Sequence, residues 1–382
     1  MSKQLYIHGA RPVGATGPVA VLLEAERILA LDSAGALPCP PDADRLEASG
    51  LLLAPGFIDL QANGAFGLDF TADPTTIWQV GAGLPRYGVT SFLPTIVTSP
   101  PATVAAAQRV LQAGPPAGYL GAQPLGLHLE GPYLNPTKRG AHDPALMRLP
   151  NCEEVAGWAR ERGVWLVTLA PELPGALDVI QALRQRGVLV SAGHSAADFD
   201  QARAGLGAGV GYGTHLFNAM SPLDHRAPGL PGALLGNPEV VVGVIADGIH
   251  VHPALLELVW RLKGPDHVSL VTDCMAALGR PPGRYQLGQL EVFVDETSAR
   301  LRDGRLAGSI LCMDQAIRNW VAFTHCAPAE AIGAATAVAA SVLGLTDRGR
   351  LQPGARADLV LLTPDLRVAA TLIGGAVAYR AA

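Results

Sequence analysis

The chain has 382 residues, of which 49% are hydrophobic and 16% charged, and its formal net charge is -5. This length suits one large domain and a smaller one, and it excludes a disulfide-stapled module and a disordered chain. The 28 basic and 33 acidic residues form no long run of either sign. A nucleic-acid binder carries a basic stripe, so no nucleic-acid partner is expected.

Five widely spaced cysteines form no CxxC pair: Cys39, Cys152, Cys274, Cys312 and Cys326. They indicate neither a disulfide framework nor a structural zinc site, so we expect a cytoplasmic protein. The first residues lack the apolar stretch of a signal peptide, and every long apolar run is interrupted before about 18 positions. We therefore expect a soluble, unprocessed protein with no membrane partner.

Both ends of the chain predict strands. Residues 4–10, 19–32 and 44–55 are strand-like segments separated by turn residues, and the tail at 354–375 has the same texture. We expect the tail to complete the N-terminal module. The prediction is a small β-sandwich domain built from both termini, residues 1–52 plus 351–382.

Between these ends, eight apolar runs alternate with helix-like segments rich in alanine and arginine: 51–63, 89–98, 124–134, 164–172, 188–195, 210–220, 240–250 and 267–273. Continuous apolar runs are typical of strands buried on both faces, and alternation with helices implies parallel pairing. We therefore predict a (β/α)₈ TIM-like barrel over residues 53–350, with an inserted hairpin at 283–309 and helices near 313–325 and 329–344. The alternative, an open doubly wound sheet, needs a GxGxxG turn that the glycines of residues 205–213 do not form.

Nearly every run ends in side chains able to do chemistry: Gln61, Asn63, Glu130, Glu172, His194, His215, Asp247, His250 and Asp273. Barrel enzymes assemble their active sites from these strand ends. A histidine alone at a strand end is usually structural, but Glu130, His194 and His215 end three different runs. One carboxylate and two imidazoles form the ligand set of a catalytic divalent ion, most often zinc, although iron and cobalt accept the same set.

Asp273 ends the eighth run, where an aspartate serves either as a helix N-cap or as a general base. We favour a base that takes a proton from the water activated by the metal and later delivers it to the leaving group. Cys274 has an apolar setting, so packing is expected rather than nucleophilic chemistry. His128 and Asp59 are expected to give polar packing or support to the site. Arg226 is interpreted either as a surface residue or, with His250, as a phosphate ligand.

Six segments carry a resemblance to a known family: GLHLEGPYLN, SAGHSAADF, THLFNAMSPL, ADGIHV, LVTDCM and LAGS. In this order and spacing they resemble the N-acetylglucosamine-6-phosphate deacetylases of the amidohydrolase superfamily. The resemblance extends from PGFIDLQANG to the C-terminal DLVLL. It implies hydrolysis of the acetamide of N-acetyl-D-glucosamine 6-phosphate to D-glucosamine 6-phosphate and acetate.

The resemblance also implies roles for particular residues. It places the metal ligands on Glu130, His194 and His215 and the catalytic aspartate on Asp273. It places the substrate contacts on Ala141, His142, Asn218, Ala219, Arg226, Asp247, Gly248, Ile249, His250, Leu306, Ala307 and Gly308. It further implies a homodimer in which Arg226 reaches the phosphate in the neighbouring subunit.

One departure concerns the number of metal ions. Two-metal amidohydrolases carry HxH at the end of the first strand, where this chain has Gln61, Ala62 and Asn63. An amide is a poor replacement for imidazole as a ligand, so we expect one divalent ion per subunit. Weak binding of a second ion through Gln61 and Asn63 stays open.

Taken together, these features form one mechanistic hypothesis. Metal-activated water attacks the amide with Asp273 as base, His142 stabilises the oxyanion, and Arg226 and His250 anchor the phosphate. One rival is an amidohydrolase acting on another N-acyl or cyclic amide. Ring-amide hydrolases of this superfamily often carry a lysine on the fourth strand, which VWLVTLAPE lacks. The other rival is a catalytically silent phosphosugar-binding regulator, which the intact set of ligands and base argues against.

Overall fold

Eight parallel strands form the centre of the molecule, in a computed structural model that describes residues 4–382. They pair in chain order: β7 (Phe57–Ala62), β10 (Val89–Val97), β12 (Leu127–Glu130), β13 (Val164–Leu169), β14 (Leu189–Ala192), β15 (Tyr212–Gly213), β16 (Val241–Val244) and β17 (Val268–Leu270). The last strand returns to the first through a parallel bridge between Ala62 and Cys274. The predicted eight-stranded barrel is confirmed, and it is nearly closed.

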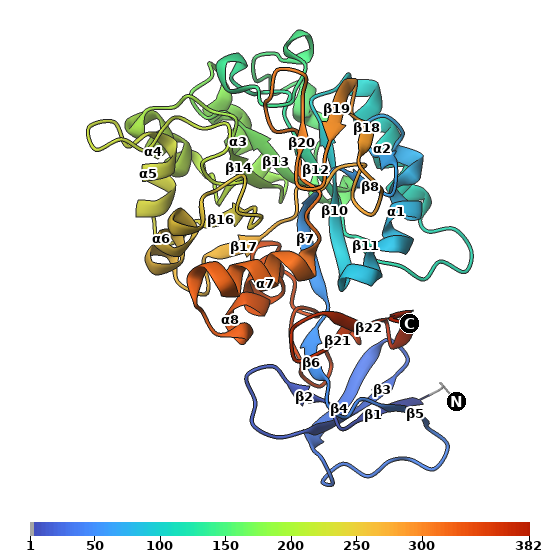
Figure 1. The fold of residues 1–382 in the computed structure, drawn as a ribbon. Coiled ribbons are helices and arrows are strands. Elements are labelled where there is room, and N and C mark those ends of the chain that lie inside the picture. Colours follow the sequence, from blue (N-terminus) through green and yellow to red (C-terminus); the bar gives the residue numbers. More distant parts are fainter. Residues whose placement is uncertain (1–3) are drawn as a thin grey trace.

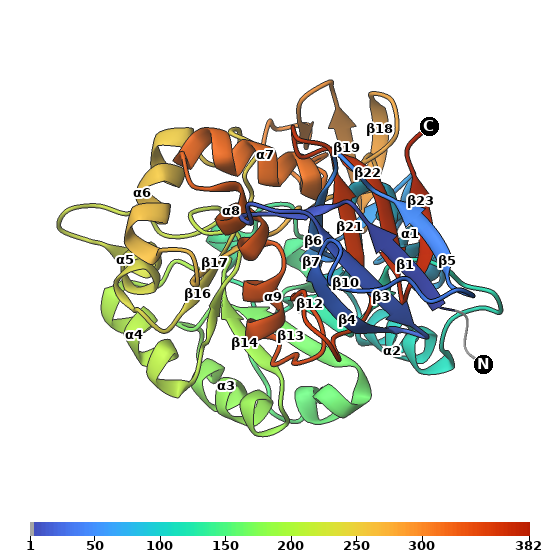
Figure 2. The same cartoon turned by 90° about the horizontal axis from the view of Figure 1, so that it is seen from below.

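The strands are apolar along their whole length because both of their faces are covered. All nine residues of β10 are buried, and so are all six of β7. Helices pack around the barrel (Figures 1 and 2): α1 (Ile77–Gly83), α2 (Pro101–Ala113), α3 (Ala176–Gln185), α4 (Phe199–Ala208), α5 (Gly229–Gly236), α6 (Pro253–Lys263), α7 (Met313–Thr324), α8 (Pro328–Ala334) and α9 (Ala337–Val342). Short 3-10 turns occupy Pro74–Thr76, Leu84–Tyr87, Pro136–Lys138, Pro144–Leu146, Glu154–Gly157 and Arg160–Arg162.

The two terminal segments form two sheets at one end of the barrel (Figure 1). One sheet has the order β4-β3-β1-β5, with β1 (Gln4–His8), β3 (Val19–Glu24), β4 (Arg27–Ser33) and β5 (Asp44–Glu47). The other has the order β2-β6-β21-β22-β23, with β2 (Arg11–Pro12), β6 (Leu52–Pro55), β21 (Leu359–Leu362), β22 (Val368–Ile373) and β23 (Ala376–Arg380). Leu53 pairs with Leu361, so the chain ends meet as predicted. The two sheets share a core that includes Ile7, Val21 and Leu372.

Three local predictions are wrong. Residues 44–55 are not one strand but β5 and β6, which belong to different sheets. Residues 19–32 are not one strand but the hairpin β3–β4, whose turn uses Ala25 in a left-handed conformation (φ 49°) instead of a glycine or proline. Residues 329–344 are not one helix but α8 and α9. The break has a physical cause, because the Ala335 carbonyl accepts a hydrogen bond from the Ile58 N–H on β7 (2.9 Å) and so leaves the helical ladder.

A hairpin lies over the barrel mouth, at the carboxyl ends of the strands (Figure 1). It contains β18 (Gly283–Leu287) and β19 (Leu290–Val294), with the short β20 (Ala299–Arg300) beside them. Leu287 shares one apolar cluster with Val97, Ala141 and Met275 from the barrel side. The predicted insertion therefore covers the strand ends instead of projecting away from them. Two shorter strands, β8 (Gly64–Ala65) and β9 (Leu68–Asp69), pair nearby, and β11 (Gln123–Pro124) pairs with β10 in parallel.

Candidate metal centre and active site

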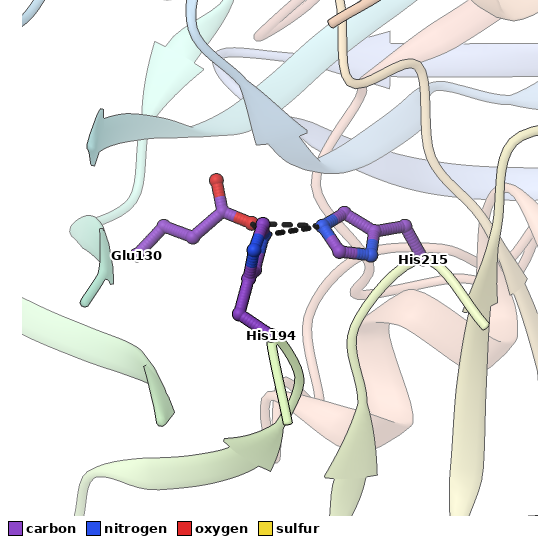
Figure 3. Close-up of side chains that lie close together, drawn as sticks. All are labelled: Glu130, His194 and His215. Atoms are coloured by element: carbon purple, nitrogen blue, oxygen red, sulfur yellow. Dashed lines mark hydrogen bonds and ion pairs between the residues drawn. The ribbon is translucent and has the colours of Figure 1, made fainter. Parts of the chain in front are cut away.

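Three ligand-type side chains meet at the carboxyl ends of three barrel strands, β12, β14 and β15 (Figure 3). Glu130 is the last residue of β12, and His194 and His215 lie two residues beyond β14 and β15. Glu130 Oε1 is 3.1 Å from His194 Nε2 and 2.9 Å from His215 Nε2, and the two Nε2 atoms are 3.1 Å apart. All three residues are buried. Within residues 4–382 this is the one such group that could hold a metal ion.

The spacing of these atoms fits a divalent ion. A tetrahedral ion with ligand bonds of about 2.1 Å holds its ligand atoms about 3.4 Å apart, slightly more than the separations found here. A small outward shift of the three side chains would therefore admit the ion. Burial raises the pKa of Glu130, but the two imidazoles outweigh burial and hold that pKa well below its usual range.

The imidazoles are oriented for binding through Nε2. His194 Nδ1 donates to the carbonyl of Lys138 (2.9 Å), which leaves the Nε2 lone pair for an ion. His215 Nδ1 is buried and has no hydrogen-bond partner within the described residues. Glu130 Oε1 is the atom that both Nε2 nitrogens face (Figure 3).

Backbone strain gathers at this site. His194 (φ 49°), His215 (φ 28°) and Asp273 (φ 50°) all have positive φ, although none is a glycine. Each such residue costs on the order of 1–3 kcal/mol and persists only where its surroundings hold it. That three strand-end residues share this conformation at one site marks the site as functional.

Asp273 accepts two amide hydrogen bonds across the barrel closure. Its Oδ1 is 2.8 Å from Asn63 Nδ2 and 3.1 Å from Gln61 Nε2, and Gln61 Nε2 also donates to Glu130 Oε1 (3.1 Å). Burial, reinforced by the charge of Glu130, raises the pKa of Asp273 to about 6. No described helix begins at Asp273, so the N-cap alternative is wrong. The carboxylate is free to act as a proton acceptor.

His142 turns one nitrogen toward the ligand group. Its Nδ1 accepts from the Thr98 backbone N–H (3.3 Å) and lies 2.8 Å from Thr98 Oγ1. Its Nε2 lies 3.7 Å from Glu130 Oε2. Burial, with the neighbouring His194, lowers the pKa of His142 to about 3, so the ring is neutral. A neutral ring that accepts at Nδ1 carries its proton on Nε2, and His142 therefore presents a hydrogen-bond donor to the site.

These groups open into one cavity of about 290 Å³. Of the residues singled out in the sequence, those that line it are Asn63, Glu130, Ala141, His142, His194, His215, Asn218, Ala219, His250, Asp273, Leu306 and Gly308. Asp247 supports the cavity from outside, because its Oδ2 is 2.6 Å from His250 Nδ1. Gly248, Ile249 and Ala307 do not line it.

Arg226 lies away from this cavity. It belongs to an exposed loop between α4 and α5 that projects from the side of the molecule (Figures 1 and 2), and it does not line the cavity of its own chain. The structure therefore does not bring Arg226 and His250 together within one chain.

Six cavity residues were missed in the sequence: Val97, Thr137, Lys138, Gly140, Leu287 and Arg305. Arg305 directly precedes the LAGS segment, and its guanidinium donates to the Gly140 carbonyl and is held by Asp303. Nothing in the sequence marks Val97 or Leu287, because each is one of many apolar residues in a strand.

Polar residues behind the site support it. Asp59 accepts from the Thr272 hydroxyl (2.6 Å), and His128 bridges Thr95 and Thr168. These contacts match the supporting role expected of Asp59 and His128. Glu172 binds Ser195 Oγ (2.7 Å) and the Ala196 N–H instead of facing the cavity. Cys274 is buried and burial raises the pKa of its thiol, which agrees with packing.

An eight-stranded barrel with a Glu–His–His group and an aspartate at its strand ends defines a class: a metal-dependent barrel hydrolase. A family model described as "Amidohydrolase family" matches residues 52–378. The chain belongs to the amidohydrolase family.

Three particular relatives indicate which amidohydrolases this chain is similar to. The N-acetylglucosamine-6-phosphate deacetylase of Rattus norvegicus is 42% identical over 355 residues, which is 88% of this chain and 86% of the relative. The N-acetylgalactosamine-6-phosphate deacetylase of Escherichia coli O157:H7 is 40% identical over 336 residues, 87% of this chain and 89% of the relative. A structure of the Mycobacterium smegmatis N-acetyl-D-glucosamine-6-phosphate deacetylase, a variant in complex with N-acetyl-D-glucosamine-6-phosphate, has a TM-score of 0.89 and 35% identity. That similarity covers 98% of this chain and 99% of that one.

Proposed function

We propose that this protein removes the acetyl group from N-acetyl-D-glucosamine 6-phosphate, giving D-glucosamine 6-phosphate and acetate. The observation that carries the proposal is the convergence of Glu130, His194, His215, Asp273 and His142 on one cavity. The similarity to deacetylases of phosphorylated N-acetylhexosamines over most of the chain supports the substrate class. The five cysteines, all free, agree with a cytoplasmic enzyme of amino sugar metabolism.

In this proposal the residues of the chain divide the chemistry among them. A divalent ion held by Glu130, His194 and His215 would supply Lewis acidity to water and to the amide carbonyl. Asp273 accepts the proton of the attacking water and then delivers it to the departing amine. His142 donates from Nε2 to the oxygen that becomes negative in the tetrahedral intermediate.

We propose one ion per subunit, with zinc as the expected metal and iron or cobalt as alternatives. Support for a single ion comes from Gln61 and Asn63. Both amides donate through nitrogen to the carboxylates of the site, and a donating amide nitrogen is not a ligand. The second ion that the sequence left open would have Asn63 Oδ1 as a ligand atom, because that oxygen is buried and has no hydrogen-bond partner within the described residues.

For the sugar and its phosphate, we propose contacts with these residues: Ala141, His142, Asn218, Ala219, Arg226, Asp247, Gly248, Ile249, His250, Leu306, Ala307 and Gly308. Arg226 would act in a homodimer, from the partner subunit. Two features of the surface support this. Arg226 lies on an exposed loop outside its own cavity, and α6 presents exposed Leu258 and Leu262 (52% and 65% exposed) that a second copy would cover. Arg binds phosphate with two parallel donors, so its loss should raise KM for the phosphosugar.

The experiment that tests this function is an acetate-release assay on the metal-loaded protein with three sugars. N-acetyl-D-glucosamine 6-phosphate should be the best substrate, and unphosphorylated N-acetylglucosamine should be poor. N-acetyl-D-galactosamine 6-phosphate is the second candidate, favoured by the 40% identity to the Escherichia coli relative. A higher kcat/KM for the galactosamine compound would reassign the sugar. Absence of acetate release from both phosphosugars would overturn the deacetylase proposal and favour another amide substrate or a silent binding protein.

A further inference from the structure

A second cavity lies behind the wall of the active-site cavity. Its volume is about 460 Å³, larger than the 290 Å³ of the first. Its lining comes from the end of β10, the segment 141–146 and the turn of the β18–β19 hairpin, which lies above β10 and β12 in Figure 1, and also includes Thr71, Ala72 and Thr103. The two cavities share four lining residues, Val97, Ala141, His142 and Leu287. These four residues therefore form a common wall.

Apart from His142, the common wall is apolar and buried. Val97, Ala141 and Leu287 are 5%, 8% and 4% exposed, and they belong to one hydrophobic cluster. Val97 is paired with Glu130 between β10 and β12, so the apolar wall begins directly beside the metal-ligand carboxylate. An apolar group attached to a reacting carbonyl would find its complement here.

The position of the reacting groups determines which part of an amide faces this wall. The carbonyl oxygen is directed to His142 Nε2, and the amide nitrogen must lie near Asp273, which protonates it. The nitrogen leads to the sugar, whose polar groups match the polar lining residues Asn218 and His250. The remaining substituent of the carbonyl carbon is the acyl chain, and it is directed toward the apolar wall.

We propose that Leu287 closes the acyl end of the active site and restricts the enzyme to acetyl groups. This inference rests on the proposed deacetylase function. Among the three apolar wall residues, Val97 is fixed in the barrel ladder and Ala141 has only a methyl group. Leu287 has the longest side chain, and shortening it would join the active site to the second cavity, where a longer acyl chain can extend.

The hairpin turn holds Leu287 in place. Gly288, the next residue, has φ +57° and donates its N–H to Asp69 Oδ2 (3.2 Å). A Cβ on Gly288 would lie 3.3 Å from Val97 Cγ2, so the turn packs closely on β10. The backbone that carries Leu287 therefore cannot simply shift aside for a larger acyl group. Selectivity for acetyl follows from a fixed wall.

The test compares kcat/KM for N-acetyl, N-propionyl and N-butyryl glucosamine 6-phosphate in the metal-loaded wild type, Leu287→Ala and Leu290→Ala. One methylene in an apolar pocket changes relative kcat/KM by roughly 10- to 200-fold, so the wild type should disfavour propionyl and butyryl by that range. Leu287→Ala should raise the butyryl-to-acetyl ratio at least about 10-fold. Leu290 is the matched control, since it pairs with Leu287 in the hairpin but lines the second cavity alone.

An unchanged ratio in Leu287→Ala, or an equal rise in Leu290→Ala, would overturn the acyl-wall inference while wild-type acetate release still upheld the deacetylase function. Wild-type protein that cleaves none of the three amides would instead overturn both proposals. If Leu287→Ala does not fold, Leu287→Val decides the question. It should raise the propionyl-to-acetyl ratio, and an unchanged ratio would count against the wall.

Discussion

Asp273 is the residue on which the chemistry of the site depends most directly. It is buried, its pKa is raised to about 6, and amides from Gln61 and Asn63 fix its orientation. We expect Asp273→Asn to lower kcat by about 10²–10⁴-fold, the usual contribution of a general base. Metal content, measured on the same preparation, should stay at the wild-type value because Asp273 is not among the three ligands. Wild-type turnover in a metal-loaded Asp273→Asn protein would remove the base assignment.

Asp59 should make stability depend on pH. Burial raises the pKa of its carboxyl to about 7, against 3.8 in an exposed chain. Between these values the folded state binds more protons than the unfolded state, so stability falls as pH rises through this window. Asp59→Asn removes the titration and keeps an oxygen acceptor for the Thr272 N–H. Between pH 5 and pH 8 the wild type should therefore lose at most about 3 kcal/mol of its free energy of unfolding through this titration, and the variant should not.

Urea unfolding of both proteins at pH 5 and at pH 8 measures their free energies of unfolding. The variant and the wild type are compared at the same pH, so that changes of metal affinity with pH affect both equally. A difference between variant and wild type that is the same at both pH values would show that Asp59 does not titrate in this range.

At the residue scale, the sequence revealed which side chains could act but not how they are held. Strand-end position alone identified Glu130, His194 and His215. The proton on His142 Nε2 depends on a contact with Thr98, and the role of Leu287 depends on the fold of a distant hairpin. Neither contact leaves a local pattern in the chain.

At the scale of elements, the loop that follows β12 lies beside the metal-ligand group and packs, through Ala141, against the hairpin β18–β19 that lies over the barrel mouth. Gly140 in this loop has φ +53°, and a Cβ there would lie 2.9 Å from His194 Cε1. Gly140→Ala should therefore displace a metal ligand and weaken metal binding, in addition to a backbone cost of about 1–2 kcal/mol. Gly118→Ala is the control, because Gly118 also has positive φ (+74°) but open space around it.

Chelator competition with zinc measures the effect, together with Tm. Both variants should lose some thermal stability, but only Gly140→Ala should lose metal affinity. Equal affinities in the two variants would mean that the loop yields without moving His194.

Elements were predictable where one local pattern determined them. Even β15, only two residues long, was found because an apolar run leads into His215. The split between α8 and α9 was not, because the cause is the Ile58 N–H, far away in sequence, which binds the Ala335 carbonyl. The Ala25 turn was missed for the related reason that an alanine carries no turn signal.

At the scale of the whole molecule, both chain ends meet the barrel at Gly56. β6 leads into β7 through Gly56, where a Cβ would collide with Thr90 Oγ1, and Gly56 N–H binds the Asp358 carbonyl (2.8 Å). We propose that residues 1–52 plus 351–382 form one small domain and residues 53–350 the catalytic barrel. The pairing of β6 with β21 supports this division, although β6 itself extends to Pro55.

A proposed homodimer would make each active site depend on two chains, and subunit mixing can test that dependence. Consider Arg226→Met and Asp273→Asn, each expected to impair its own homodimer. In a heterodimer of the two, the Arg226→Met subunit keeps Asp273 and would receive Arg226 from the partner subunit. One complete site is therefore restored, whereas the other lacks both groups.

Differently tagged subunits, co-expressed and purified through both tags, give the heterodimer. Its kcat per dimer should be about half that of the wild type with a wild-type KM for the phosphosugar, since one of two sites is intact and phosphate binding is restored there. If Arg226 served its own subunit, the heterodimer would contain one site without the arginine and one without the base, and KM would stay raised. A chain that remains monomeric would yield no doubly tagged species, and phosphate binding would then have to come from groups in its own cavity.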